Sequence, residues 1–235
     1  MAGTLYLIPT PLGDSPLNTV LPEETRAVAK RLNHFVVEQA KTARAFLKQV
    51  GTERPIQQLH LAELNEHTRA EALDSLLAPL HDGHDVGLLS EAGCPAVADP
   101  GANLVRLAHR HGITVKPLVG PSSILLALMG SGLVGQRFAF HGYLPAKPEA
   151  RAKAIRDLET RAQREDAAQV FIETPYRNTA LLDTLLSVCR PDTQLSIAVD
   201  LTTAQEFIRT QSVTDWRKAL PNLDKRPTVF LLWHA

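Results

Sequence analysis

Short apolar runs alternate with amphipathic helical patterns through the first half of the chain. The runs predict strands at 4–9, 34–38, 56–61, 85–90 and 113–118. The patterns between them predict helices at 24–32, 42–50, 67–80 and 103–111. Because each helix returns the chain to the same edge of the growing sheet, this order predicts a parallel sheet with helices on both faces.

The order of elements changes near residues 117–121. Helices are expected at 122–129, 148–165 and 179–189, and strands at 137–143, 168–173, 195–201, 206–211 and 228–233. The last three strands have only one short helix between them, and strands so closely spaced favour a mixed sheet. We therefore expect an α/β fold with two domains: an N-terminal α/β domain with a parallel sheet at 1–118, and a C-terminal α+β domain with a mixed sheet at 119–235.

Composition narrows the class of protein. The chain has 25 basic and 25 acidic side chains, and its 44% hydrophobic content is ample for a core. A neutral balance weighs against a large nucleic-acid footprint but leaves room for a local patch. The closest basic cluster lies on the helix expected near 147–164, which also carries acidic residues, so a solvated face is the simpler interpretation.

Cysteine usage and hydropathy indicate the compartment. Cys94 and Cys189 lie in different halves without a C-x-x-C, so neither a structural disulfide nor a thiolate zinc site is expected. The N-terminus lacks the features of a signal peptide, and the longest apolar run, 124–129, is too short to cross a bilayer. We expect a soluble, cytoplasmic protein that does not contact membranes.

The segment LLSEAGCPAVADPG, residues 88–101, follows a buried strand and leads directly into a helix. Ligands of parallel sheets bind at the carboxyl ends of the strands, which is where this loop falls. Gly93 permits a positive φ or close approach of a ligand. Asp99 before Pro100 is typical of a helix N-cap, which explains it without a ligand. Glu91 suits a ligand hydroxyl or amine, yet it equally suits a solvent-facing position.

A second loop, LVGPSS at 118–123, leaves the last strand of the first half. Gly120 and Pro121 force a turn, and the hydroxyls of Ser122 and Ser123 fall at a helix N-terminus with free amides. They serve either as an ordinary cap or as anion ligands. Two such loops beside a domain boundary predict a small-molecule site.

These two loops resemble those of the tetrapyrrole methylase superfamily, and within it the branch of 16S ribosomal RNA 2′-O-ribose methyltransferases. Three further segments agree in order and spacing: LYLIPTPLGD at 5–14, FHGYLPAK at 140–147 and FIETPYR at 171–177. The resemblance covers most of the chain. It implies two α/β domains, S-adenosylmethionine as the cofactor, a cleft between the domains as its site, and a homodimer.

The resemblance also implies which positions bind the cofactor: Ser90, Glu91, Ala92, Val97, Ser122, Ser123, Thr174, Asp200, Pro227 and Thr228. By residue type, Glu91 suits the amine or ribose hydroxyls, and the two serines suit the carboxylate. Val97, Pro227 and Thr228 suit the adenine. No catalytic residue is assigned; a base for a 2′-hydroxyl has four candidates, each more simply a solvated or capping residue: Glu38, Glu63, Glu66 and His67.

Some segments depart from the ribosomal branch. Gln39, Ala40, Ala62 and Leu64 stand where that branch has polar residues, and the Thr-Thr-Ala-Gln run at 202–205 is closer to the wider superfamily. The first hypothesis is still ribosomal RNA ribose 2′-O-methylation, because the motifs with the strongest resemblance point to it. Methylation of a small molecule, tetrapyrrole-like or other, and a cofactor-binding paralogue without methyl transfer both stay open.

Other chemistries are weakly supported. The His-Asp pairs at 81–85 superficially resemble metal ligands, but the pattern there indicates a helix-to-strand connector, so no metal is expected. The sequence contains no G-x-S-x-G, G-x-G-x-x-G or P-loop motif.

Overall fold

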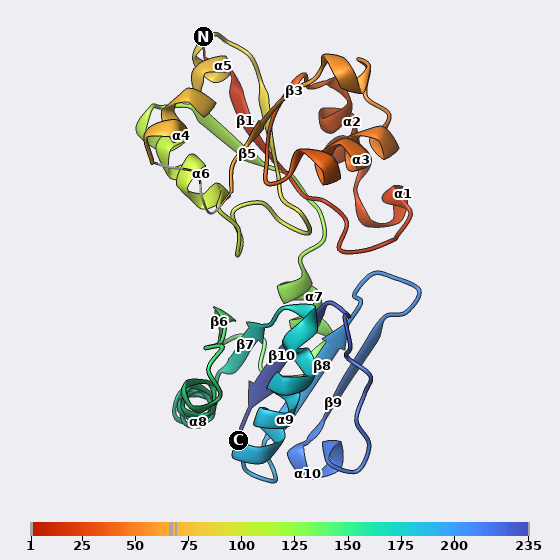
Figure 1. The fold of residues 1–235 in the computed structure, drawn as a ribbon, viewed down its shortest axis with the longest axis vertical. Helices are drawn as coiled ribbons and strands as arrows, with labels where there is room; N and C mark the ends of the chain where they lie inside the picture. The colour runs from red at the N-terminus through yellow and green to blue at the C-terminus, as the bar shows by residue number, and fades with distance from the viewer. Residues whose placement is uncertain (1, 66–67, 69, 235) are drawn as a thin grey trace. The chain divides into compact units, whose positions relative to one another are not determined.

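The chain forms two compact units, Met1–Ser122 and Ser123–Ala235, each built around one five-stranded sheet. The computed structural model shown in Figure 1 describes residues 2–65, 68 and 70–234. The boundary between the units falls slightly later than the division after residue 118 that the sequence suggests.

The first sheet is parallel throughout. It contains β1 (Thr4–Ile8), β2 (His34–Val37), β3 (His60–Glu63), β4 (Val86–Leu89) and β5 (Thr114–Pro117) in the order β3-β2-β4-β1-β5. Every residue of the central strand β4 is buried, because helices cover both faces of the sheet. The predicted parallel sheet is confirmed.

Successive residues of β4 point to opposite faces of the sheet, so they pack in two different cores. Leu89 packs in the core covered by α1 (Leu17–Val20), α2 (Glu23–Arg31) and α3 (Ala40–Val50). Leu88 packs in the core covered by α4 (Ala70–Leu76), α5 (Ala78–His81) and α6 (Gly101–Arg110). Figure 1 shows these two groups of helices on opposite sides of the strands.

Two expected elements of this unit are corrected. The strand expected at 56–61 is a 3-10 turn, η1 (Ile56–Gln58), followed by β3, because the Leu59 amide bonds the Ile56 carbonyl and sheet pairing begins only at His60. The single helix expected at 67–80 is two short helices, since Pro79 lies in the first turn of α5 and has no N–H to continue α4. Glu66 and His67 lie outside the described residues.

The second sheet is mixed, as expected. It contains β6 (Phe138–Tyr143), β7 (Ala168–Ile172), β8 (Gln194–Val199), β9 (Phe207–Ser212) and β10 (Thr228–Trp233) in the order β6-β7-β10-β8-β9. Only β6 and β7 pair in parallel; β10 is antiparallel to both neighbours and β8 is antiparallel to β9.

The core of the second unit is built on Phe171, Phe230 and Trp216, all fully buried. α8 (Pro148–Glu165), α9 (Asn178–Val188) and α10 (Val213–Trp216) contribute to this core, with the short 3-10 turn η2 (Pro175–Arg177) leading into α9. α7 (Ser123–Ser131) packs against β8, β9 and β10. Among the described residues, no helix is long and apolar enough to cross a membrane.

Three imidazole rings stack at the amino ends of adjacent strands in the first sheet. The His34 ring lies 4.7 Å from that of His60 and 4.9 Å from that of His84, centroid to centroid. Burial, together with the nearby His60, His84 and Arg54, lowers the pKa of His34 below its ordinary value. The neutral ring is therefore the favoured form in the folded state.

This lowered pKa predicts acid sensitivity. The unfolded chain binds the His34 proton more tightly, so this contribution to stability is complete above the unfolded pKa of about 6.5 and is lost as the pH falls below it. We expect the urea midpoint to fall less for His34→Phe than for the wild type between about pH 7.5 and about pH 5.5. His109→Phe, which lies outside the stack, is the matched control. An equal fall in His34→Phe and the wild type would contradict the prediction.

Candidate functional site

Reciprocal backbone hydrogen bonds hold the β4–α6 loop, residues 90–100, on the carboxyl edge of the first sheet. The Thr10 amide donates to the Gly93 carbonyl at 3.0 Å, and the Gly93 amide donates to the Thr10 carbonyl at 3.1 Å. The Ser90 hydroxyl also donates to the Gly93 carbonyl, at 2.8 Å, while the Thr10 hydroxyl donates to the Ser90 carbonyl. The loop after β4 is thus fixed to the chain that follows β1.

The loop has three residues in left-handed backbone conformations. Gly93 has a φ of 79°, which confirms the expected reason for glycine there. Ala96 and Ala98 also have positive φ, at 66° and 58°, which costs about 1–2 kcal/mol per non-glycine residue. Sequence reasoning did not predict this strain, because alanine is not a residue that favours the left-handed region.

Asp99 stabilises the strained loop. Its Oδ1 atom accepts hydrogen bonds from the Ala96 amide at 2.8 Å and from the Gly101 amide at 2.7 Å. Gly101 allows this approach, since a Cβ there would lie 2.7 Å from the same oxygen. Burial raises the pKa of the Asp99 carboxyl, and the two amide hydrogen bonds oppose that rise.

The prediction that Asp99 is the N-cap residue of α6 is corrected. α6 begins at Gly101, and the flanking N-cap position is occupied by Pro100, whose backbone is already helical. Asp99 nevertheless binds the amide of the first helical residue. It therefore satisfies a free amide at the helix start from one residue further back than a standard cap.

The second loop lies against the first. The Cys94 thiol donates to the Pro121 carbonyl at 3.4 Å, and the Leu118 amide bonds the Leu7 carbonyl. Burial raises the pKa of Cys94, which keeps it a thiol and opposes a nucleophilic role. Ser122 is half-buried, and α7 begins at Ser123. The expected proximity of the two loops is thus found within the first unit.

Two glutamates meet the amino end of α3, at the carboxyl edge of the same sheet. The Glu63 carboxylate accepts the Ala40 amide at 3.0 Å, and the exposed Glu91 carboxylate accepts the Thr42 hydroxyl. Glu63 was a candidate base, and here it serves as an acceptor for the helix start. Thr42 was missed by sequence reasoning, since a threonine in a first helical turn has an ordinary capping explanation.

Four predicted positions of the first unit lie on the β4–α6 loop but differ in exposure, whereas Ser122 lies on the second loop. Ser90 is buried and its hydroxyl donates within the loop, whereas Glu91, Ala92 and Val97 are exposed. An exposed carboxylate beside an exposed apolar side chain suits a ligand with both polar and apolar parts.

Four predicted positions of the second unit gather at one end of its sheet, whereas Ser123 begins α7. The Asp200 amide donates to the Pro227 carbonyl at 3.0 Å, and Thr228 pairs with Val199 at the end of β8. Val229 pairs with Ile172, which brings the end of β7, just before Thr174, to the start of β10. The mixed sheet therefore brings Thr174, Asp200, Pro227 and Thr228 together.

Two arginine–carboxylate pairs support this end of the sheet and were not predicted. Arg226 Nε donates to Asp200 Oδ2 at 2.7 Å. Arg177 Nη2 donates at 2.6 Å to Oε1 of Glu173, whose side chain is fully buried. No signal in the sequence pairs these residues, because each contact depends on the sheet register or on the turn after β7.

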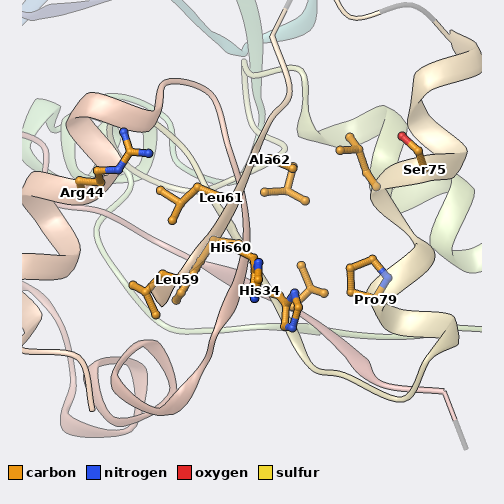
Figure 2. A pocket seen from close by; sticks show the side chains of 12 residues that line it. His34, Arg44, Leu59, His60, Leu61, Ala62, Ser75 and Pro79 are labelled. Carbon is orange, nitrogen blue, oxygen red and sulfur yellow. The ribbon is translucent and has the colours of Figure 1, made fainter. Parts of the chain in front are cut away.

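A separate cavity of about 370 Å³ lies beside the edge strand β3 and is lined by residues of β2, β3 and the neighbouring helices. Figure 2 shows Arg44 on one side of this strand and Ser75 and Pro79 on the other. The described residues that line it include none of the predicted cofactor positions. Among described residues, no group of His, Cys, Asp or Glu is arranged to hold a metal ion.

Comparison with known proteins follows the same motifs. The family model described as "Tetrapyrrole (Corrin/Porphyrin) Methylases" matches residues 4–215. The chain belongs to the tetrapyrrole methylase family. Two solved structures of methyltransferases share the fold at 20% identity: CobJ, with a TM-score of 0.66, covering 100% of this chain and 95% of that one, and uroporphyrin-III-C-methyltransferase from Thermus thermophilus, with a TM-score of 0.57, covering 99% and 93%.

Curated relatives of this tetrapyrrole methylase are named "Ribosomal RNA small subunit methyltransferase I". The Xylella fastidiosa protein is 37% identical over 79% of this chain, and the match spans 64% of that protein, less than two thirds of its length. The Pseudomonas aeruginosa protein is 31% identical over 100% of this chain and 80% of its own length. By these relationships the chain is a methyltransferase.

The loop geometry predicts a stability cost for removing the Asp99 carboxylate. Asp99→Ala leaves the amides of Ala96 and Gly101 without their acceptor, and we expect a loss of about 1–2 kcal/mol in the free energy of unfolding. Urea denaturation measures it, with the exposed Asp82→Ala as the control. Unchanged stability in Asp99→Ala would show that the strained loop does not need this carboxylate.

Proposed function

We propose that this methyltransferase uses S-adenosylmethionine and methylates a ribose 2′-hydroxyl of ribosomal RNA. The observation that carries the proposal is the similarity along the whole chain to relatives named as ribosomal RNA methyltransferases. The chain shares its fold with a uroporphyrin-III-C-methyltransferase and sequence similarity with relatives named for ribosomal RNA, so the fold alone does not select the acceptor.

The residues at hand fit the cofactor. Glu91 offers an exposed carboxylate for hydroxyl or amine donors, and Val97 offers 47% exposed apolar surface for a ring. Ser123 begins a nine-residue helix whose free amides suit a carboxylate. In the second unit, Pro227 is exposed beside the buried Thr228. We propose the ten predicted positions as the cofactor site.

When bound, S-adenosylmethionine supplies a methyl group already activated by its sulfonium. The chain's task is then to hold donor and acceptor in line and to exclude water. The loop supports this positioning, since hydrogen bonds of Thr10, Gly93 and Asp99 already hold its backbone. Glu38 and Glu63 remain candidates for accepting the acceptor's proton, as do Glu66 and His67.

A small-molecule acceptor, or loss of methyl transfer, is the second candidate. Leu64, which replaces a polar residue of the ribosomal branch, is 3% exposed and packs in a core. The basic cluster on α8 is also partly consumed: Arg151 is buried against Thr184, and Arg161 and Arg164 both pair with Glu165. Three of the six basic side chains at 147–164 are thus engaged within the chain, which lowers the positive charge available to neutralise RNA phosphates.

The cofactor part of the proposal predicts binding by titration calorimetry. We expect one site per chain for S-adenosylhomocysteine. Glu91→Gln keeps the shape of the side chain but removes its charge, and we expect it to weaken binding about tenfold or more. Glu53→Gln, an exposed change elsewhere on the first unit, is the matched control. Absence of heat at millimolar ligand would refute the cofactor.

If ribosomal RNA is the acceptor, the chain should complement the loss of the ribosomal RNA methyltransferase in cells. Expressed in cells that lack the ribosomal enzyme, the chain should restore the 2′-O-methyl at the target nucleotide, read by primer extension. Labelled methyl donor with fractionated lysate gives the complementary reading. Label found in small molecules would contradict the RNA acceptor and support a small-molecule acceptor. No transfer of label, with cofactor binding retained, would support loss of methyl transfer.

The proposal includes a homodimer that acts in the cytoplasm, where ribosomal RNA is found. Light scattering of the purified chain measures the first point. A monomer mass at micromolar concentration would contradict it.

A further inference from the structure

The amino end of α3 has an unusual set of acceptors. Gln39 occupies the N-cap position, but its side chain makes no capping hydrogen bond. The Ala40 amide is instead satisfied by Glu63, which comes from the neighbouring strand β3. Thr42, one turn into the helix, lies against two oxygens at once: the Gln39 carbonyl, at 3.0 Å, and Glu91 Oε1.

A hydroxyl has one proton and can donate it fully to only one of these acceptors. The Glu91 carboxylate is the stronger acceptor, because a hydrogen bond to a charged oxygen is about twice as strong as one between neutral groups. The Gln39 carbonyl also depends less on Thr42, since it already accepts the Ala43 amide at 3.1 Å. Thr42 therefore donates to Glu91.

This contact matters because Glu91 is otherwise exposed and has a long, flexible side chain. The loop that carries Glu91 is fixed by Thr10 and Gly93, but those bonds hold only its backbone. Binding of a ligand by a free glutamate would require its rotamers to be fixed at that moment, which weakens affinity. A hydroxyl from a different, rigid element removes that cost in advance.

We propose that Thr42 is a positioning residue that holds the Glu91 carboxylate ready for a hydroxyl or ammonium donor of the cofactor. Glu91 Oε1 is directed toward α3, which leaves Oε2 for the ligand. The inference rests on the proposed cofactor site and deepens it: affinity depends on a side chain of α3 that does not itself touch the ligand.

The test compares S-adenosylhomocysteine affinities by calorimetry. Thr42→Val keeps the shape and removes the hydroxyl, and we expect about tenfold weaker binding, whereas Thr42→Ser should restore affinity to within about twofold. In the Glu91→Gln background, Thr42→Val should cause little further loss, since its effect acts through the carboxylate. Thr19→Val is the matched control, because Thr19 also donates to a carbonyl three residues earlier at a helix start.

The outcomes separate the two proposals. A wild type that does not bind refutes the cofactor site and this inference with it. A wild type that binds, with Thr42→Val unchanged or tighter, overturns only the inference. An equal loss from Thr42→Val in both backgrounds also overturns it, because the effect would then be structural. If Thr42→Val loses its cooperative urea transition, Thr42→Ala replaces it in the same cycle.

Discussion

The pair of hydrogen bonds between Thr10 and Gly93 determines the geometry of the carboxyl edge of the first sheet. It joins the loop after β4 to the chain after β1, two segments that the sequence places far apart. Gly93 can accept and donate there only with its positive φ. Once this bridge is formed, the turn that follows is forced through Ala96 and Ala98, and the Asp99 carboxylate offsets the strain by binding two amides.

In the second unit, a charged side chain holds a turn whose backbone is also left-handed. Asp200 and Thr202 have positive φ, which is rare for a β-branched residue such as threonine. Arg226 holds this turn with hydrogen bonds to the Asp200 carboxylate and the Gln205 carbonyl. A guanidinium can bind both at once because its donors are arranged in a fixed plane. Both units therefore place strained backbone where cofactor binding is proposed, as expected where a site must be rigid before its ligand arrives.

The loops of the proposed cofactor site and the side chains near the expected acceptor both have structural contacts in this chain. The two loops that resemble the ribosomal branch, 88–101 and 118–123, are held together by hydrogen bonds of their backbone and of Cys94. Leu64 packs in a core, and the Glu63 carboxylate accepts the first amide of α3. The methyltransferase fold is thus separated from the choice of acceptor, which depends on a few polar side chains.

Sequence reasoning predicted the order of most strands and helices, the parallel and mixed sheets, and the need for glycine at 93, because these follow from local periodicity and backbone sterics. It placed a strand too early before His60 and merged α4 with α5, since pairing register and a proline within a helical pattern decide such boundaries. The folded chain was needed to show that Ala96 and Ala98 are left-handed, that Arg226 pairs with Asp200, and that Thr42 contacts Glu91. Each of these features depends on contacts between residues that are distant in the chain. The local sequence around each residue does not contain its partner, so local patterns do not predict the contact.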